Sequence, residues 1–91
     1  MEPFQKFAPA LLAEIIRRQP ASPERTAFAW SVAVGPALAR ATTVEIRNRN
    51  LIVTARDTRW ARELERARGT ILARVQVLLG DDAVKGLYIN A

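Results

Sequence analysis

The feature that most constrains the fold is the alternation of apolar and polar residues on both sides of a short polar segment, in TTVEIRNRNLIVTARD, residues 42–57. A period of two is typical of β-strands with one buried face. A slip of one residue would turn a strand's apolar side chains to the opposite face. Ile46 must therefore lie opposite Leu51, which requires a hairpin loop of either two or four residues. Asparagine tolerates a positive φ, so Asn48 and Asn50 suit this turn.

A long amphipathic helix is expected after the hairpin, with Asp57 or Thr58 as its cap and Gly80 at its end. At about 100° per residue, its apolar side chains form a stripe about 80° wide that should face the sheet. Gly69 points away from this stripe, so it marks either a tolerated weak point or a break between two helices. We expect one helix. The stripe contains Trp60, Leu64, Ala67, Ile71, Val75 and Leu78.

The C-terminal segment is expected to add a third strand over residues 84–90, after a turn at Asp81 and Asp82. Leu87 and Ile89 should point toward the core. A strand that follows a single helix usually runs parallel to the strand before that helix, and the crossover between them is right-handed. The sheet should therefore be mixed.

Two helices are expected before the hairpin. The first should begin near Phe7 or Ala8, with Pro9 in its first turn, and should end by Gln19 because a proline follows. Its apolar residues recur at helical spacing. They are Phe4, Phe7, Leu11, Leu12, Ile15 and Ile16.

The second helix carries signals at both ends, with Ser22 as N-cap and Gly35 as C-cap. Its apolar residues lie on nearly every side, which is typical of a buried helix. We therefore expect Trp30 in the core, with a partner for its indole N–H. A short helical turn, residues 36–41, should lead into the hairpin.

The expected order is helix, helix, strand, strand, long helix, strand. This order predicts an α+β fold with a three-stranded mixed sheet packed on helices. We expect one domain over residues 1–91, with a helical N-terminal part (1–41) and a ββαβ core (42–90).

The positive charge is concentrated in the middle of the chain. Residues 40–74 contain nine arginines and four acids, which accounts for the whole net charge of +5. Such clustering favours an anionic partner, nucleic acid first. A coding bias toward arginine would explain the choice of residue but not its location.

Six arginines are the candidate phosphate ligands. Three of them lie on the long helix within about 60° of arc, opposite the apolar stripe. The alternative is a solvated face with local pairs to Glu63 and Glu65. Tyr88, expected on the outer sheet face with Ile52 and Thr54, gives little support for base stacking. The six are Arg47, Arg49 and Arg56 of the hairpin and its exit, and Arg59, Arg62 and Arg66 of the helix.

Several function classes find no support in the sequence. There is no histidine and no cysteine, which removes the commonest general base, transition-metal ligand and thiolate. We therefore expect no enzyme activity, no metal, no cofactor and no small-molecule substrate.

No apolar run approaches the roughly 18 residues of a membrane span, and the N-terminus does not resemble a signal peptide. A cytoplasmic location is the expectation.

The segments FAWSVAVGPALARAT and NLIVTARDTRWARELERARGTILARVQVLLGDDAVKGLYI together resemble the bacterial DciA family. The resemblance covers about residues 26–90 and rests on the order and spacing of its positions. A tryptophan and a glycine come first, then a strand with L-x-V, then W-x-x-E-L at the start of a long helix that ends at Leu-Gly. The matching residues are Trp30, Gly35, Leu51, Val53, Trp60, Glu63, Leu64, Leu79 and Gly80.

The resemblance implies a K-homology-like domain that interacts with the replicative DNA helicase and helps load it onto single-stranded DNA. Trp30, Gly35, Trp60 and Leu64 would then be structural positions of the core. The Gly-x-x-Gly loop of true K-homology domains is absent, so nucleic acid would be bound through the arginines. The alternative is a non-enzymatic protein–protein adaptor whose basic charge is incidental.

Overall fold

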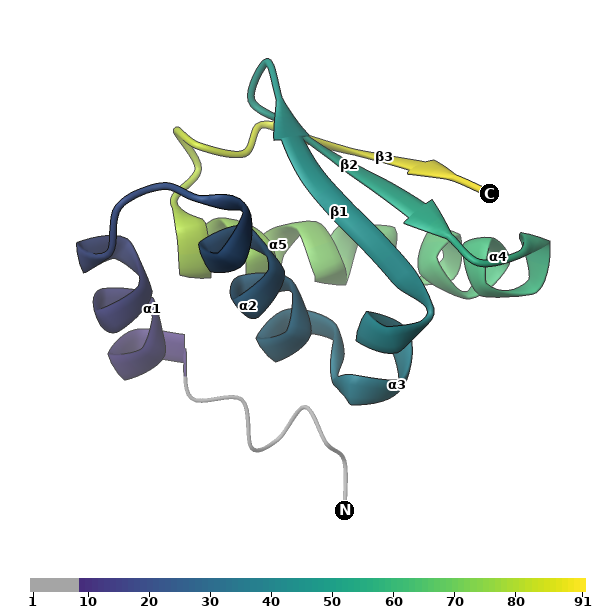
Figure 1. Ribbon diagram of the computed structural model, residues 1–91, viewed down its shortest axis with the longest axis horizontal. Coiled ribbons are helices and arrows are strands. Elements are labelled where there is room, and N and C mark those ends of the chain that lie inside the picture. Colours follow the sequence, from purple (N-terminus) through teal and green to yellow (C-terminus); the bar gives the residue numbers. More distant parts are fainter. Residues whose placement is uncertain (1–8) are drawn as a thin grey trace.

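The computed structural model of the chain describes residues 9–91 (Figure 1). It has the expected α+β fold with a mixed three-stranded sheet. Phe4 and Phe7, and the expected helix start near Phe7 or Ala8, lie outside the described residues. The elements are α1 (Pro9–Arg18), α2 (Pro23–Val34), α3 (Pro36–Arg40), β1 (Thr42–Arg47), β2 (Asn50–Ala55), α4 (Thr58–Arg66), α5 (Arg68–Leu79) and β3 (Gly86–Asn90).

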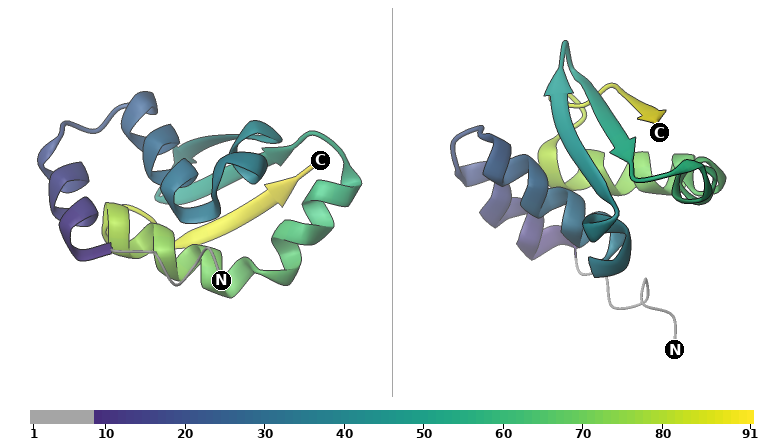
Figure 2. Two further views of the ribbon diagram at one scale, coloured as in Figure 1. Left: turned by 90° about the horizontal axis from the view of Figure 1, so that it is seen from below. Right: turned by 45° about the vertical axis from the view of Figure 1, so that its right-hand side comes forward.

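The sheet has the strand order β1-β2-β3. β1 and β2 are antiparallel, and Ile46 lies opposite Leu51, so the alternation of apolar residues predicted the register correctly. The hairpin loop has two residues, because Arg47 pairs with Asn50. β3 runs parallel to β2, as expected for a strand that follows a helical crossover. The helices gather on one side of the sheet (Figures 1 and 2).

The core lies between the inner face of the sheet and the helices. Leu51, Val53 and Leu87 of the sheet pack with buried side chains of α1, α2, α4 and α5. Burying this apolar surface is the main stabilising term of such a fold. The expectation that α2 is buried on nearly every side is wrong, because Phe28 is 50% exposed. Within residues 9–91, α2 packs on α5, α3 and β1, and the side of α2 that carries Phe28 is not covered by them.

Trp30 connects three elements within this core. Its side chain is only 3% exposed, and its Nε1–H donates a hydrogen bond to Thr42 Oγ1 at 2.8 Å. The Thr42 hydroxyl in turn donates to the Leu38 carbonyl of α3 at 2.7 Å. The indole N–H therefore has the partner that a buried tryptophan needs.

Both predicted caps of α2 are present. Ser22 Oγ accepts a hydrogen bond from the Arg25 N–H at 3.0 Å. Gly35 has a φ of +89°, a conformation that side chains disfavour, and its N–H donates to the Ser31 carbonyl at 2.9 Å. The chain can therefore leave α2 and enter α3 within one residue.

The expected long helix is in fact two helices, α4 and α5, so the prediction of one helix is wrong. The break is at Ala67, with φ −106° and ψ 14°, and the Ala67 N–H donates to the Leu64 carbonyl at 3.1 Å. Gly69 lowers the helix propensity here by about 1 kcal/mol relative to alanine, which reduces the cost of a break. The resulting bend, visible in Figure 2, lets α4 contact β2 and β3 while α5 packs on α1 and α2.

Arg68 connects the break between α4 and α5 to the sheet. Its guanidinium forms two hydrogen bonds with the Glu65 carboxylate, each 3.0 Å long, and a third with the Leu87 carbonyl of β3. The hydrogen bond to Arg68 lowers the pKa of Glu65, and the same bond raises the pKa of Arg68. α4, α5 and β3 are thus joined at one side chain.

Candidate nucleic-acid interface

The hairpin tip presents two of the predicted arginines. Asn48 and Arg49 form its two-residue loop, with φ values of 53° and 64°, the left-handed conformation of a type I′ turn. The expectation that Asn48 and Asn50 supply the turn is half wrong. Asn50 is the first residue of β2 and pairs with Arg47. Arg49 occupies the position at which glycine is usual.

Lys85 joins this tip, although the sequence did not single it out. Its backbone N–H donates to the Arg49 carbonyl at 2.6 Å, and its side chain is exposed. The parallel pairing of Asn50 with Gly86 brings the two residues together. The strand expected over residues 84–90 would have included Lys85, whereas β3 begins at Gly86, so Lys85 belongs to the connection at the tip. Arg47, Arg49 and Lys85 are called the tip cluster.

Arg56 lies at the other end of the hairpin, beside Arg40. The Arg56 N–H donates to the Ala41 carbonyl at 2.8 Å, which extends the β1–β2 ladder by one pair. A shallow depression of about 260 Å³ is lined by both arginines and by Thr43 and Thr54. We call it the Arg40–Arg56 depression. Arg40 was not among the predicted site residues.

The three remaining arginines, Arg59, Arg62 and Arg66, are exposed on α4. Asp57 caps this helix, since its Oδ1 accepts from the Trp60 N–H at 3.0 Å. Arg66 forms an exposed ion pair with Glu63 at 3.6 Å. Surface pairs of this kind are weak, so the pair leaves the arginine available to a stronger anion.

Trp60, expected in the core stripe, is only partly buried, whereas Leu64 is fully buried. Trp60 packs against the rim of the core and, together with Arg59 and Glu63, lines a small surface depression. The reason is its place in the first turn of α4. The core is formed mainly further along, where the chain has bent into α5.

The structure divides the six predicted arginines into two groups. β2, six residues long, separates the tip cluster from Arg56 by about 20 Å at the usual rise per residue. Arg47 and Arg49 lie at one end of the sheet. Arg56 lies at the other end, close in sequence to the exposed arginines of α4.

Some of these charges are already paired. Arg47 forms an ion pair with Glu45 at 2.9 Å. By contrast, five guanidinium groups on the hairpin, on the residues that flank it and on α4 form no salt bridge with an acid within residues 9–91, so their charge is available to an external anion. They belong to Arg40, Arg49, Arg56, Arg59 and Arg62.

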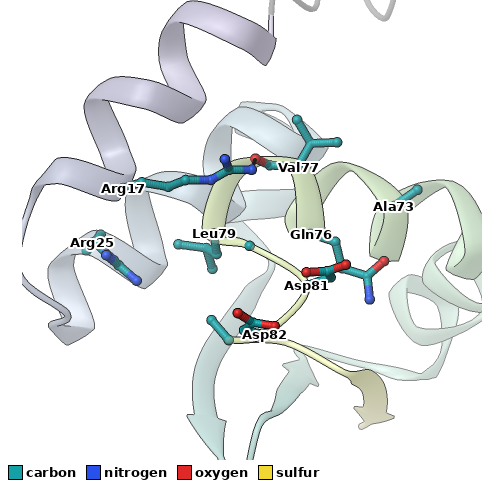
Figure 3. Close-up of a pocket in the computed structure, with 10 residues that line it drawn as sticks. Arg17, Arg25, Ala73, Gln76, Val77, Leu79, Asp81 and Asp82 are labelled. Carbon is teal, nitrogen blue, oxygen red and sulfur yellow. Dashed lines mark hydrogen bonds between the residues drawn. The ribbon is translucent and has the colours of Figure 1, made fainter.

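A hollow of about 670 Å³ lies where α1, α5 and the turn after α5 meet (Figure 3). Arg17 donates to the Val77 carbonyl at the end of α5, and Arg25 donates to the Gln19 carbonyl at 2.9 Å. Both arginines therefore serve the packing of the helices. Asp81 and Asp82 also line this hollow, which makes it unsuited to phosphate.

Comparison with known proteins decides the family. A family model described as "Dna[CI] antecedent, DciA" matches residues 3–89. The chain belongs to the DciA family. DciA is a family of accessory proteins for helicase loading, so membership supports a role in DNA replication, with the replicative helicase as the indicated partner.

The other comparisons returned no match, neither among curated proteins nor among solved structures. The K-homology-like fold implied by the resemblance to DciA therefore stays an expectation beyond the α+β architecture described above. No helix in residues 9–91 is both long and apolar enough to cross a membrane. In the same part of the chain, no three metal-ligating side chains come together.

Proposed function

We propose that this DciA-family chain assists the loading of the replicative DNA helicase by binding single-stranded DNA through its arginines, without catalysing a reaction itself. The observation that carries the proposal is the exposed, unpaired positive charge at both ends of the sheet. Guanidinium groups bind phosphate with two parallel hydrogen bonds. Family membership supplies the helicase as the second partner.

Binding would hold an exposed DNA strand beside the helicase without any change of covalent bonds. Arg56, Arg59 and Arg62 follow one another at the exit of β2 and along α4, so phosphates could be bound in succession. The sheet and the buried stripe of α4 keep this surface rigid, which reduces the entropy lost when DNA binds.

The direct test is the salt dependence of binding to a labelled single-stranded oligonucleotide, measured by fluorescence anisotropy. Four to six phosphate contacts predict a slope of log K against log salt of about −3 to −4. Co-sedimentation with the helicase at low salt should show association. A slope near zero combined with helicase association would favour the alternative, an adaptor with incidental charge. Absence of both would contradict the proposal altogether.

Arg49→Gly is expected to stabilise the fold and weaken DNA binding. Glycine adopts the positive φ of this turn without steric cost, whereas arginine does so at about 1–2 kcal/mol. Glycine also loses more entropy on folding, so the net gain should be up to about 1 kcal/mol. Removing one phosphate contact should reduce the salt slope by about 0.7. Urea unfolding and anisotropy measure the two effects.

The matched control is Arg49→Asn, which also tolerates a positive φ but removes the charge. It should weaken DNA binding as much as the glycine variant does. If Arg49→Gly lowered the free energy of unfolding, the arginine would be required by the fold itself. Its role as a DNA ligand would then lose support.

A further inference from the structure

The outer face of the sheet carries no helix in the described part of the chain (Figure 2). Side chains of a strand alternate between the two faces, so the pairing of the strands orders the residues of the outer face into three rows. The rows are Thr43, Thr54 and Asn90; Glu45, Ile52 and Tyr88; and Arg47, Asn50 and Gly86.

Tyr88 provides a flat aromatic surface in the middle row. It lies directly opposite Ile52 and is 55% exposed. A Cβ atom at Gly86 would be 4.0 Å from Tyr88 Cε2 and 2.9 Å from Asn50 Oδ1. The ring therefore lies on the side of Gly86, two residues earlier on the same strand, where no side chain covers it. Much of the ring is open to solvent.

Positively charged side chains lie on either side of Tyr88, at the two ends of the strands. Arg49 and Lys85 of the tip cluster lie at one end, and the Arg40–Arg56 depression at the other. Alternation places Arg56, two residues after Thr54, on the outer side. The hydroxyls of Thr43 and Thr54 beside it are additional donors for a phosphate oxygen.

The single acid of this face lies at its far edge. Glu45 is on β1 and is paired with Arg47 at 2.9 Å, whereas Tyr88 is on β3, at the opposite edge of the sheet. The Glu45–Arg47 pair leaves the β1 side without net charge there, so a polyanion is attracted along the β2–β3 side instead.

We propose that single-stranded DNA lies along the β2–β3 half of the outer sheet face. The strand passes from the α4 arginines to the Arg40–Arg56 depression, where a phosphate binds. A base then stacks on Tyr88 against Ile52, and the strand leaves past Arg49 and Lys85. Stacking on an exposed aromatic ring needs an unpaired base, so a single strand fits this face and a duplex does not. The inference rests on the proposed DNA binding and adds its path and its stacking residue.

The test compares Tyr88→Ala, Tyr88→Phe and Phe28→Ala in single-stranded DNA binding across a salt series. Tyr88→Ala should weaken affinity roughly 5- to 150-fold, from the usual contribution of one stacked base, with an unchanged salt slope. Tyr88→Phe keeps the ring and should bind within about twofold of wild type. Phe28 is a matched control, because it is similarly exposed but lies on α2. Its replacement should leave binding unchanged.

A second measurement places the strand directly. An oligonucleotide carrying 5-iodouracil should cross-link on irradiation to the peptide that contains Tyr88, the only tyrosine of the chain. The double variant Arg40→Gln with Arg56→Gln should reduce the salt slope by about 1.4, corresponding to two phosphate contacts. Thermal melts verify that each variant is folded.

The outcomes separate this inference from the proposed function. If wild type binds DNA with a steep salt slope while Tyr88→Ala binds equally well and cross-links lie elsewhere, the path is wrong and the proposed function stands. If wild type fails to bind DNA, both fail. If Tyr88→Ala loses helicase association but keeps DNA binding, the face is a protein-docking surface. Equal dependence of duplex binding on Tyr88 would also overturn the inference.

Discussion

Replacing Arg59, Arg62 and Arg66 together with glutamate is expected to abolish single-stranded DNA binding while the protein stays folded. Each substitution changes the charge by two, so the net charge falls from +5 to −1. Phosphates would then be repelled where they were bound, and the salt slope should flatten. All three side chains are exposed. Losing the Arg66–Glu63 pair should therefore cost less than about 1 kcal/mol.

Two controls distinguish the loss of local phosphate contacts on α4 from the change in the net charge of the protein. Arg18→Glu also changes the charge by two, on an exposed position of α1 away from the hairpin and α4, and should weaken binding only slightly. Replacing the three α4 arginines with lysine keeps the charge and should retain most of the affinity. If the triple glutamate variant binds DNA as wild type does, this face of α4 is only a solvated surface.

Trp30→Ala is expected to cost about 3–5 kcal/mol of unfolding free energy. The side chain is almost fully buried, and removing it leaves a cavity between α2 and the sheet. The total stability of a domain is about 5–15 kcal/mol, so a large share would be lost. Urea unfolding followed by circular dichroism measures the change, and Trp60 remains as a second, fluorescent probe.

Two variants test the origin of this cost. Trp30→Phe keeps most of the apolar contact but removes the hydrogen bond to Thr42, so it should cost far less than alanine. Trp60→Ala should also cost less than Trp30→Ala, because Trp60 is only partly buried at the rim of the core. An equal cost at Trp30 and Trp60 would contradict the division between core and rim.

Much of the fold followed from local rules. The register of the hairpin was predictable because alternation allows only an even loop, and Ile46 indeed lies opposite Leu51. The caps at Ser22 and Gly35 were predictable because capping depends on neighbouring residues. The parallel β3 followed from the helical crossover that connects it to β2.

The sequence-based expectations were wrong where tertiary contacts determine the local structure. The break at Ala67 has no strong local signal, because the residue itself favours helix. It depends on the packing of α4 and α5 against different elements and on the bonds of Arg68 to Glu65 and Leu87. Likewise, Phe28 fits a buried pattern by sequence, but its side chain is half exposed in the structure.

The candidate site was predictable only in part. Helical spacing correctly placed Arg59, Arg62 and Arg66 on one exposed helix. The separation of the arginines into two ends of the sheet needs the hairpin geometry. Arg40 and Lys85 reach their neighbours through pairing between segments distant in sequence, which composition and spacing do not reveal.

The hydrogen bond from Arg68 to the Leu87 carbonyl has a consequence for the free edge of the sheet. β3 is an edge strand, and edge strands attract further strands from other molecules. With this carbonyl occupied, an incoming strand finds one of its acceptors already taken. The contact of Arg68 therefore makes the free edge of β3 a poorer template for strand addition by another molecule.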